Sequence, residues 1–173
     1  MISGVRIWAA VGVGMTVLLA SAGQAAPIAA PSPPPASVNL MRPLTLTKIR
    51  DMDFGNLATI SAGTATIDPL TEALAVTGGI SQAGGTVQSA RFAGSTQSSA
   101  VVNIKVPNKT VLLTRVGGTE TLSVTAFTLD GQSKRTLAQA GVFEFNVGAT
   151  VSVTNGQAEG LYTGTFDVTI QYP

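Results

Sequence analysis

The chain has 173 residues, a length that suits one domain with short extensions. Only 11% of the residues are charged and the formal net charge is +1, which argues against a strong field for nucleic acid or an anionic membrane. Cysteine is absent, so the fold must be held by packing and strand pairing without disulfides. Histidine is also absent, which removes the commonest general base and the commonest zinc ligand.

Residues 1–25 have the pattern of a secretory signal peptide. Arg6 supplies a positive charge before an apolar stretch, residues 7–20, that is too short for a comfortable membrane span. Small residues follow, and cleavage after Ala25 or Ala26 fits the pattern. We therefore expect an exported protein, located in the periplasm, at the cell surface or outside the cell.

Residues 26–37 form a proline-rich linker. Proline lacks an amide donor and favours extended polyproline geometry, so this stretch cannot be a central strand. We interpret it as a spacer between the leader and a β-domain that covers residues 38–173.

The domain reads as a series of short strands separated by glycine-rich turns. The predicted strands are 38–48 (one, or two divided at Arg42-Pro43), a run within 49–57 that ends at Gly55-Asn56, 65–67, 73–77, 86–93, 100–106, 111–114, 122–129, 143–153 and 160–172. Residues 143–153 form either one strand bent at a bulge near Gly148 or two strands in sequence. No helical period follows the leader, so the pattern predicts an all-β, antiparallel β-sandwich.

The last predicted strand has the clearest alternation. Successive side chains of a strand point to opposite faces, so its even-numbered residues should face a core and its odd-numbered residues should face water. The predicted core residues of this strand are Tyr162, Phe166, Val168, Ile170 and Tyr172. Leu161, Thr163, Thr165, Asp167, Thr169 and Gln171 lie between them.

The chain offers little catalytic or ligand-binding chemistry. Asp51 and Asp53 could act as a carboxylate pair, but a solvated strand end beside Arg50 explains them as well. The paired glycines lack the strand–glycine–helix context of a phosphate loop. We read Arg91 as a residue of a hydrated face, with an ion pair as the second option. We predict no catalytic, cofactor-binding or metal-binding residue.

Three stretches, in this order and spacing, resemble the bacterial family called domain of unknown function 4402. They are residues 44–47 with 52–55, residues 147–153, and residues 160–166 with Val168 and Tyr172. The closing strand is also similar to those of pilin-like and spore-coat-U-like secreted domains. These resemblances imply an immunoglobulin-like sandwich, export from a Gram-negative cell and a role as a surface or fimbrial subunit. They imply no functional residues.

The functional hypothesis is a structural subunit of a surface fibre or coat that assembles by β-strand addition. The best candidate donor strand is residues 37–48, with Val38, Leu40, Leu44 and Leu46 on one face. The expected acceptor is an edge near the C-terminal strand, so the expected partners are further copies or other envelope subunits. Escort by a periplasmic chaperone is left open. The alternative is a monomeric binding module for a glycan or an envelope protein.

Overall fold

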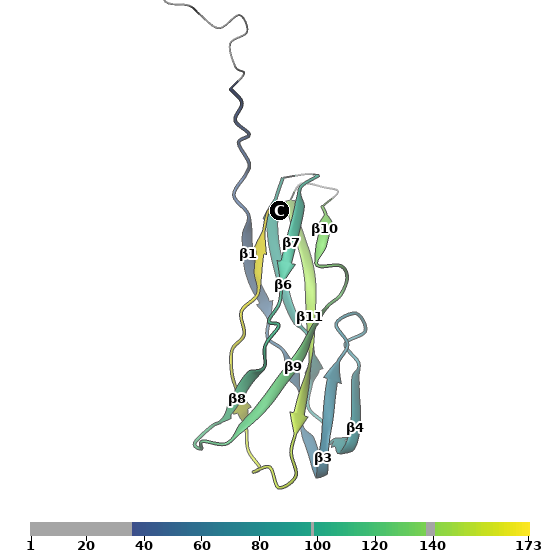
Figure 1. Cartoon of the computed structure of the whole chain (residues 1–173). Helices are drawn as coiled ribbons and strands as arrows, with labels where there is room; N and C mark the ends of the chain where they lie inside the picture. Colours follow the sequence, from purple (N-terminus) through teal and green to yellow (C-terminus); the bar gives the residue numbers. More distant parts are fainter. Residues whose placement is uncertain (1–35, 98, 138–140) are drawn as a thin grey trace, which may run out of the picture. The chain divides into compact units, whose positions relative to one another are not determined.

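The computed structural model describes residues 36–97, 99–137 and 141–173. The predicted leader and most of the proline-rich linker lie outside these residues. The chain divides into two compact units, residues 1–39 and 40–173, and of the first unit only residues 36–39 are described. All described strands belong to the second unit, which we call the domain (Figure 1).

The predicted all-β, antiparallel fold is confirmed. The strands are β1 (Thr45–Arg50), β2 (Asp53–Phe54), β3 (Leu57–Ile67), β4 (Leu74–Gln82), β5 (Val87–Gln88), β6 (Ala90–Thr96), β7 (Val101–Lys105), β8 (Val111–Arg115), β9 (Thr121–Leu129), β10 (Lys134–Thr136), β11 (Gly141–Val153), β12 (Tyr162–Thr163) and β13 (Thr169–Gln171). The described residues include no helix long and apolar enough to cross a membrane.

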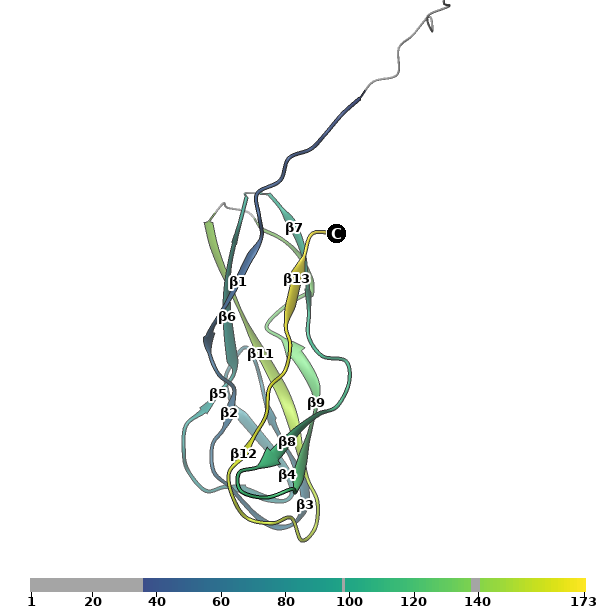
Figure 2. The same cartoon turned by 90° about the vertical axis from the view of Figure 1, so that its left-hand side faces the viewer.

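The described strands form three sheets (Figures 1 and 2). The largest runs in the order β1-β6-β11-β9-β8-β12, and β3 joins it through β11 and carries β4 on its other side. A second sheet has the order β10-β7-β13, and β2 pairs with β5 alone. Strand β11 is the centre of the large sheet because different parts of its length pair with β6, β9 and β3.

Residues 141–153 form one long strand, which resolves the two options left by the sequence. Its pairing with β9 shifts register between Gly148 and Thr150. The additional residue lies on β9, where Ala126 and Phe127 stand opposite Ala149, and Ala126 has a left-handed φ of 50°. Gly148 is required for a different reason: a Cβ atom there would lie 2.2 Å from the Ile67 carbonyl oxygen.

Apolar side chains form two buried clusters. The first is built on Ala90, Phe92, Ile104, Phe145 and Val147, which come from β6, β7 and β11. The second is built on Ala65, Val124, Ala149 and Val151, from β3, β9 and β11. Because β7 belongs to the second sheet, the first cluster packs the two larger sheets against each other, as in a sandwich.

A row of phenylalanine rings runs through the first cluster. Phe143 stacks on Phe145 and Phe145 stacks on Phe92, with ring centroids 6.4 and 5.5 Å apart. The edge-on contact of Phe92 with Phe166 spans 6.4 Å, and Phe166 meets Phe127 at 5.1 Å. Such offset and edge-on contacts add stability beyond area burial.

Several strand boundaries differ from the predictions. The predicted strand at 73–77 continues through Gly78-Gly79 to Gln82, because β3 pairs with it along this length and Gly78 takes a φ of 69° at the irregularity. The first strand begins only at Thr45, after Pro43. The closing stretch 160–172 is divided into β12 and β13.

A polar cluster connects the end of β1, the turn after β3 and the residue before β6. The Arg50 guanidinium pairs with Glu72 and donates from Nε to the Ser89 carbonyl oxygen at 3.1 Å. The Ser89 hydroxyl is buried and donates to Glu72 Oε1 at 3.1 Å. The hydrogen bond from Arg50 is the main reason that the pKa of Glu72 is lowered.

Replacing Phe166 tests the packing of the closing stretch. Phe166→Ala should lower the free energy of unfolding by about 3 kcal/mol, because the ring contacts Phe92 and Phe127. Thr165→Ala is the matched control, since Thr165 is exposed, and it should change little. Urea unfolding followed by circular dichroism measures both, and equal losses would contradict the assigned faces.

Replacing Glu72 tests the polar cluster. Glu72→Gln should cost about 1 kcal/mol at neutral pH, a value discounted for solvent because the carboxylate is about one-third exposed. The folded pKa is lowered, so this stabilisation is present above the ordinary pKa of 4.5 and declines as the pH falls below it. Unfolding curves from pH 7 to pH 3 should therefore converge for the two proteins. A gap that is constant with pH would contradict this assignment.

Candidate functional site

The closing stretch lies against two different neighbours. Thr163 pairs with Thr114 of β8, and Thr169 pairs with Lys105 of β7. Between these pairs lie five residues on the closing stretch (164–168) but eight on the other side (106–113). The surplus residues must leave the ladder, and Pro107 among them has no amide to donate to it. We call residues 106–110 the arch.

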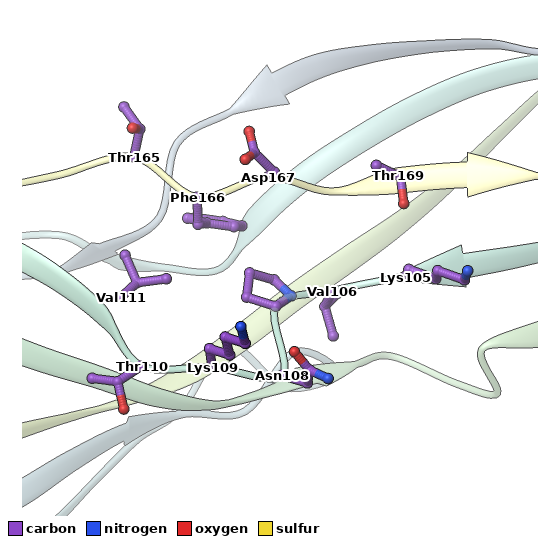
Figure 3. Close-up of a pocket in the computed structure, with 11 residues that line it drawn as sticks. Lys105, Val106, Asn108, Lys109, Thr110, Val111, Thr165, Phe166, Asp167 and Thr169 are labelled. Atoms are coloured by element: carbon purple, nitrogen blue, oxygen red, sulfur yellow. The ribbon is translucent and has the colours of Figure 1, made fainter.

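An open pocket of about 300 Å³ lies between the arch and the closing stretch (Figure 3). The Phe166 ring extends toward the arch, whereas Thr165 and Asp167 point to the opposite side. Lys105 and Lys109 bring positive charge to the lining. The pocket therefore combines an aromatic face with hydroxyl groups and positive charge.

The backbone of residues 165–167 is left without partners. These residues belong to no strand, and within the described parts of the chain none of the backbone hydrogen bonds formed outside the ladders involves them. Their side chains nevertheless keep the alternation of a strand, because Phe166 is half-buried between exposed Thr165 and Asp167. The segment is therefore extended and packed on the core, and its backbone groups are available to pair with an added strand.

A second unpaired line separates this closing stretch from β1. In the ladders of the described residues, β1 pairs only with β6, and β13 pairs only with β7. Leu46 of β1 and Phe166, Val168 and Ile170 of the closing stretch nevertheless pack against the same buried cluster. We call the line between β1 and residues 164–172 the seam. Its two sides run in opposite directions (Figure 2).

Tyr172 bridges one end of the seam. Its hydroxyl donates to the Arg42 carbonyl oxygen at 2.9 Å, and the Thr96 hydroxyl can donate to it in turn. Paired strands lie only about 4.8 Å apart, a spacing shorter than a tyrosine side chain together with a hydrogen bond. The two sides are therefore joined here by a side chain rather than by a backbone ladder.

The predicted donor residues fall into two groups. Val38 and Leu40 are 83% and 88% exposed, while Leu44 and Leu46 are half-buried. Leu46 lies in β1 opposite Gly94 of the same chain, so the predicted donor strand is already paired there within its own subunit.

The predicted core residues of the closing stretch lie on its inner side. Phe166, Val168 and Ile170 pack against the first cluster, and Tyr172 bridges the seam. Tyr162 is half-buried and its hydroxyl donates to the Ala158 carbonyl oxygen at 2.6 Å.

The acidic candidates have structural partners. Asp51 pairs with Lys48 at 2.6 Å, and Asp53 Oδ1 accepts a hydrogen bond from the Gly55 amide at 2.8 Å. Arg91 lies on an exposed face and also forms an ion pair with Glu144, so the expected hydrated position and the expected ion pair occur together. These contacts account for the charges without a ligand.

The comparison with protein families decides the identity of the domain. A family model described as Domain of unknown function (DUF4402) matches residues 44–172. The chain belongs to this family. The match begins immediately before β1 and ends at Tyr172, so the DUF4402 domain includes both sides of the seam and leaves the exposed Val38 and Leu40 outside it. No curated protein and no solved structure matches the chain significantly.

Hydrogen exchange tests the unpaired backbone. The amide of Phe166 should exchange at least about a hundredfold faster than the amide of Ile104, which lies in β7 and donates to the Ser133 carbonyl oxygen at 2.8 Å. Amide-resolved exchange followed by nuclear magnetic resonance provides the measurement. Equal protection of the two amides would show that residues 165–167 already have backbone partners.

Proposed function

We propose that this protein is an exported structural subunit of a bacterial cell-surface fibre or coat that assembles by β-strand addition. The leader-like pattern of residues 1–25 supports export. The seam carries the proposal for assembly, because two unpaired strand edges border one apolar cluster.

The physical argument rests on what an added strand would gain. Free edges present backbone amides and carbonyls that pair readily with another chain. At the seam these groups lie beside the half-buried Leu46, Phe166 and Val168. A strand placed there would form hydrogen bonds with the two edges of the seam, which we call its rims. It would also remove apolar surface from water, which stabilises the contact by about 25 cal/mol for each Å² buried.

Common protective features of edge strands are sparse along the closing stretch. Edges are usually blunted by charged side chains, prolines or bulges. Residues 162–172 contain one charge, Asp167, and no proline. The stretch thus has the composition of an edge that accepts a partner.

The pocket beside the arch favours a second candidate function, a binding module for a glycan. A sugar ring could stack on Phe166 while Asn108 and Lys109 supply hydrogen bonds. The pocket is open and has a single aromatic residue, so we rank this function second. A glycan array with the purified protein tests it, and binding lost in Phe166→Ala but kept in Thr163→Ala would favour it.

A proline substitution tests strand addition. Lys48→Pro removes a β1 amide that points to the seam and away from β6, so the domain should fold normally while the added strand loses a hydrogen bond. Lys48→Ala keeps the amide and is the matched control. We expect the unaltered protein and Lys48→Ala to form multimers, and Lys48→Pro to form far fewer.

Size-exclusion chromatography, electrophoresis without boiling and electron microscopy of cells with and without the protein provide the readouts. Circular dichroism verifies folding of both variants. A strictly monomeric protein with no surface structures would contradict the proposed function.

A further inference from the structure

The segment before β1 has the features of a strand without a partner. Ala36, Val38 and Leu40 alternate with Ser37 and Asn39, so an extended chain would place the larger apolar side chains on one face. No charge occurs before Arg42 in this segment. Val38 and Leu40 are 83% and 88% exposed, which is unusual for large apolar side chains only two residues apart.

The seam suits an uncharged strand with one apolar face. Its floor is apolar, so a charge facing inward would lose its hydration without a partner. Its rims run in opposite directions, and a strand between them is therefore antiparallel to one rim. The rim formed by residues 164–172 has nine residues, so it can accommodate the six residues 36–41.

We propose that residues 36–41 of one copy fill the seam of a second copy, with Val38 and Leu40 facing the first apolar cluster. This inference rests on the proposed function and names the donor. Ser37 and Asn39 then face water, and the backbone amides and carbonyls of the segment pair with the rims.

The geometry favours a second copy over the same chain. The segment leads directly into β1, which forms one rim, so its own insertion would need a reversal at Arg42-Pro43. The Tyr172 hydroxyl holds the Arg42 carbonyl oxygen at that position. Donor and acceptor are different surfaces of the subunit, so the contact is head-to-tail and produces an open chain of subunits.

Substitutions of alternate residues provide the first test. Leu40→Asp should weaken assembly of the full-length protein about a hundredfold or more, because the carboxylate would be buried unpaired. Asn39→Asp adds the same charge one residue away on the hydrated face and should assemble normally. Both positions are exposed in the isolated subunit, so neither variant should unfold. Equal assembly of the two variants would overturn the assignment.

Engineered cysteines provide the second test, since the chain contains none of its own. Leu40→Cys protein mixed with Val168→Cys or Ile170→Cys protein should form disulfide-linked dimers at least tenfold faster than Asn39→Cys protein does. Leu112→Cys, exposed on another face, measures random collision. Equal rates, or an internal disulfide in a Leu40→Cys/Val168→Cys chain at high dilution, would overturn insertion into a second copy.

The two tests separate this inference from the proposed function. If Lys48→Pro abolishes multimers but Leu40→Asp does not, strand addition holds and the donor is another segment. If no variant or unaltered protein forms multimers, both proposals fail. Loss of assembly in Leu40→Asp and Lys48→Pro, with Asn39→Asp unaffected, supports both.

Discussion

Apolar packing around a row of phenylalanine rings holds the two larger sheets together where their backbones do not pair, because Ile104 of β7 lies in one cluster with Phe92 and Phe145. Phe143, Phe145 and Phe92 stack along the inner side of β11 and β6, and Phe166 joins them from the closing stretch. Dispersion and apolar burial need no alignment of amides and carbonyls. The domain can therefore be well packed and still have free strand edges. Gly94 is part of the arrangement, because a Cβ there would lie 2.5 Å from the Phe143 ring.

The sequence predicted those features that depend on local periodicity. The alternation of the closing stretch follows from the two-residue period of an extended chain, and the half-buried Phe166 and Val168 lie between exposed neighbours. The all-β class followed in the same way. Strand ends were predicted less well. Gly78-Gly79 looks like a stop signal in isolation, but pairing with β3 carries the strand across it.

The candidate site depends on pairings between distant residues, and a single sequence does not contain them. The division of the closing stretch arises from the arch, about sixty residues earlier in the chain. Pro107 was a visible signal, but only the register shows that it lies opposite residues 164–168. The seam likewise exists because β1 pairs with β6 and β13 pairs with β7, so β1 and β13 do not pair with each other. The alternation of Val38 and Leu40 was visible in the sequence, but their exposure was not, because the sequence predicted a strand there and β1 begins only at Thr45.

The position of β11 in the chain has a consequence for biosynthesis. This strand supplies partners to β3, β6 and β9, yet it begins only at Gly141 of a 173-residue chain. While the ribosome is still making the earlier strands, their future neighbour does not exist, so the large sheet cannot close around its centre. Non-local pairing of this kind slows folding. A nascent chain therefore cannot complete this sheet until β11 has left the ribosome.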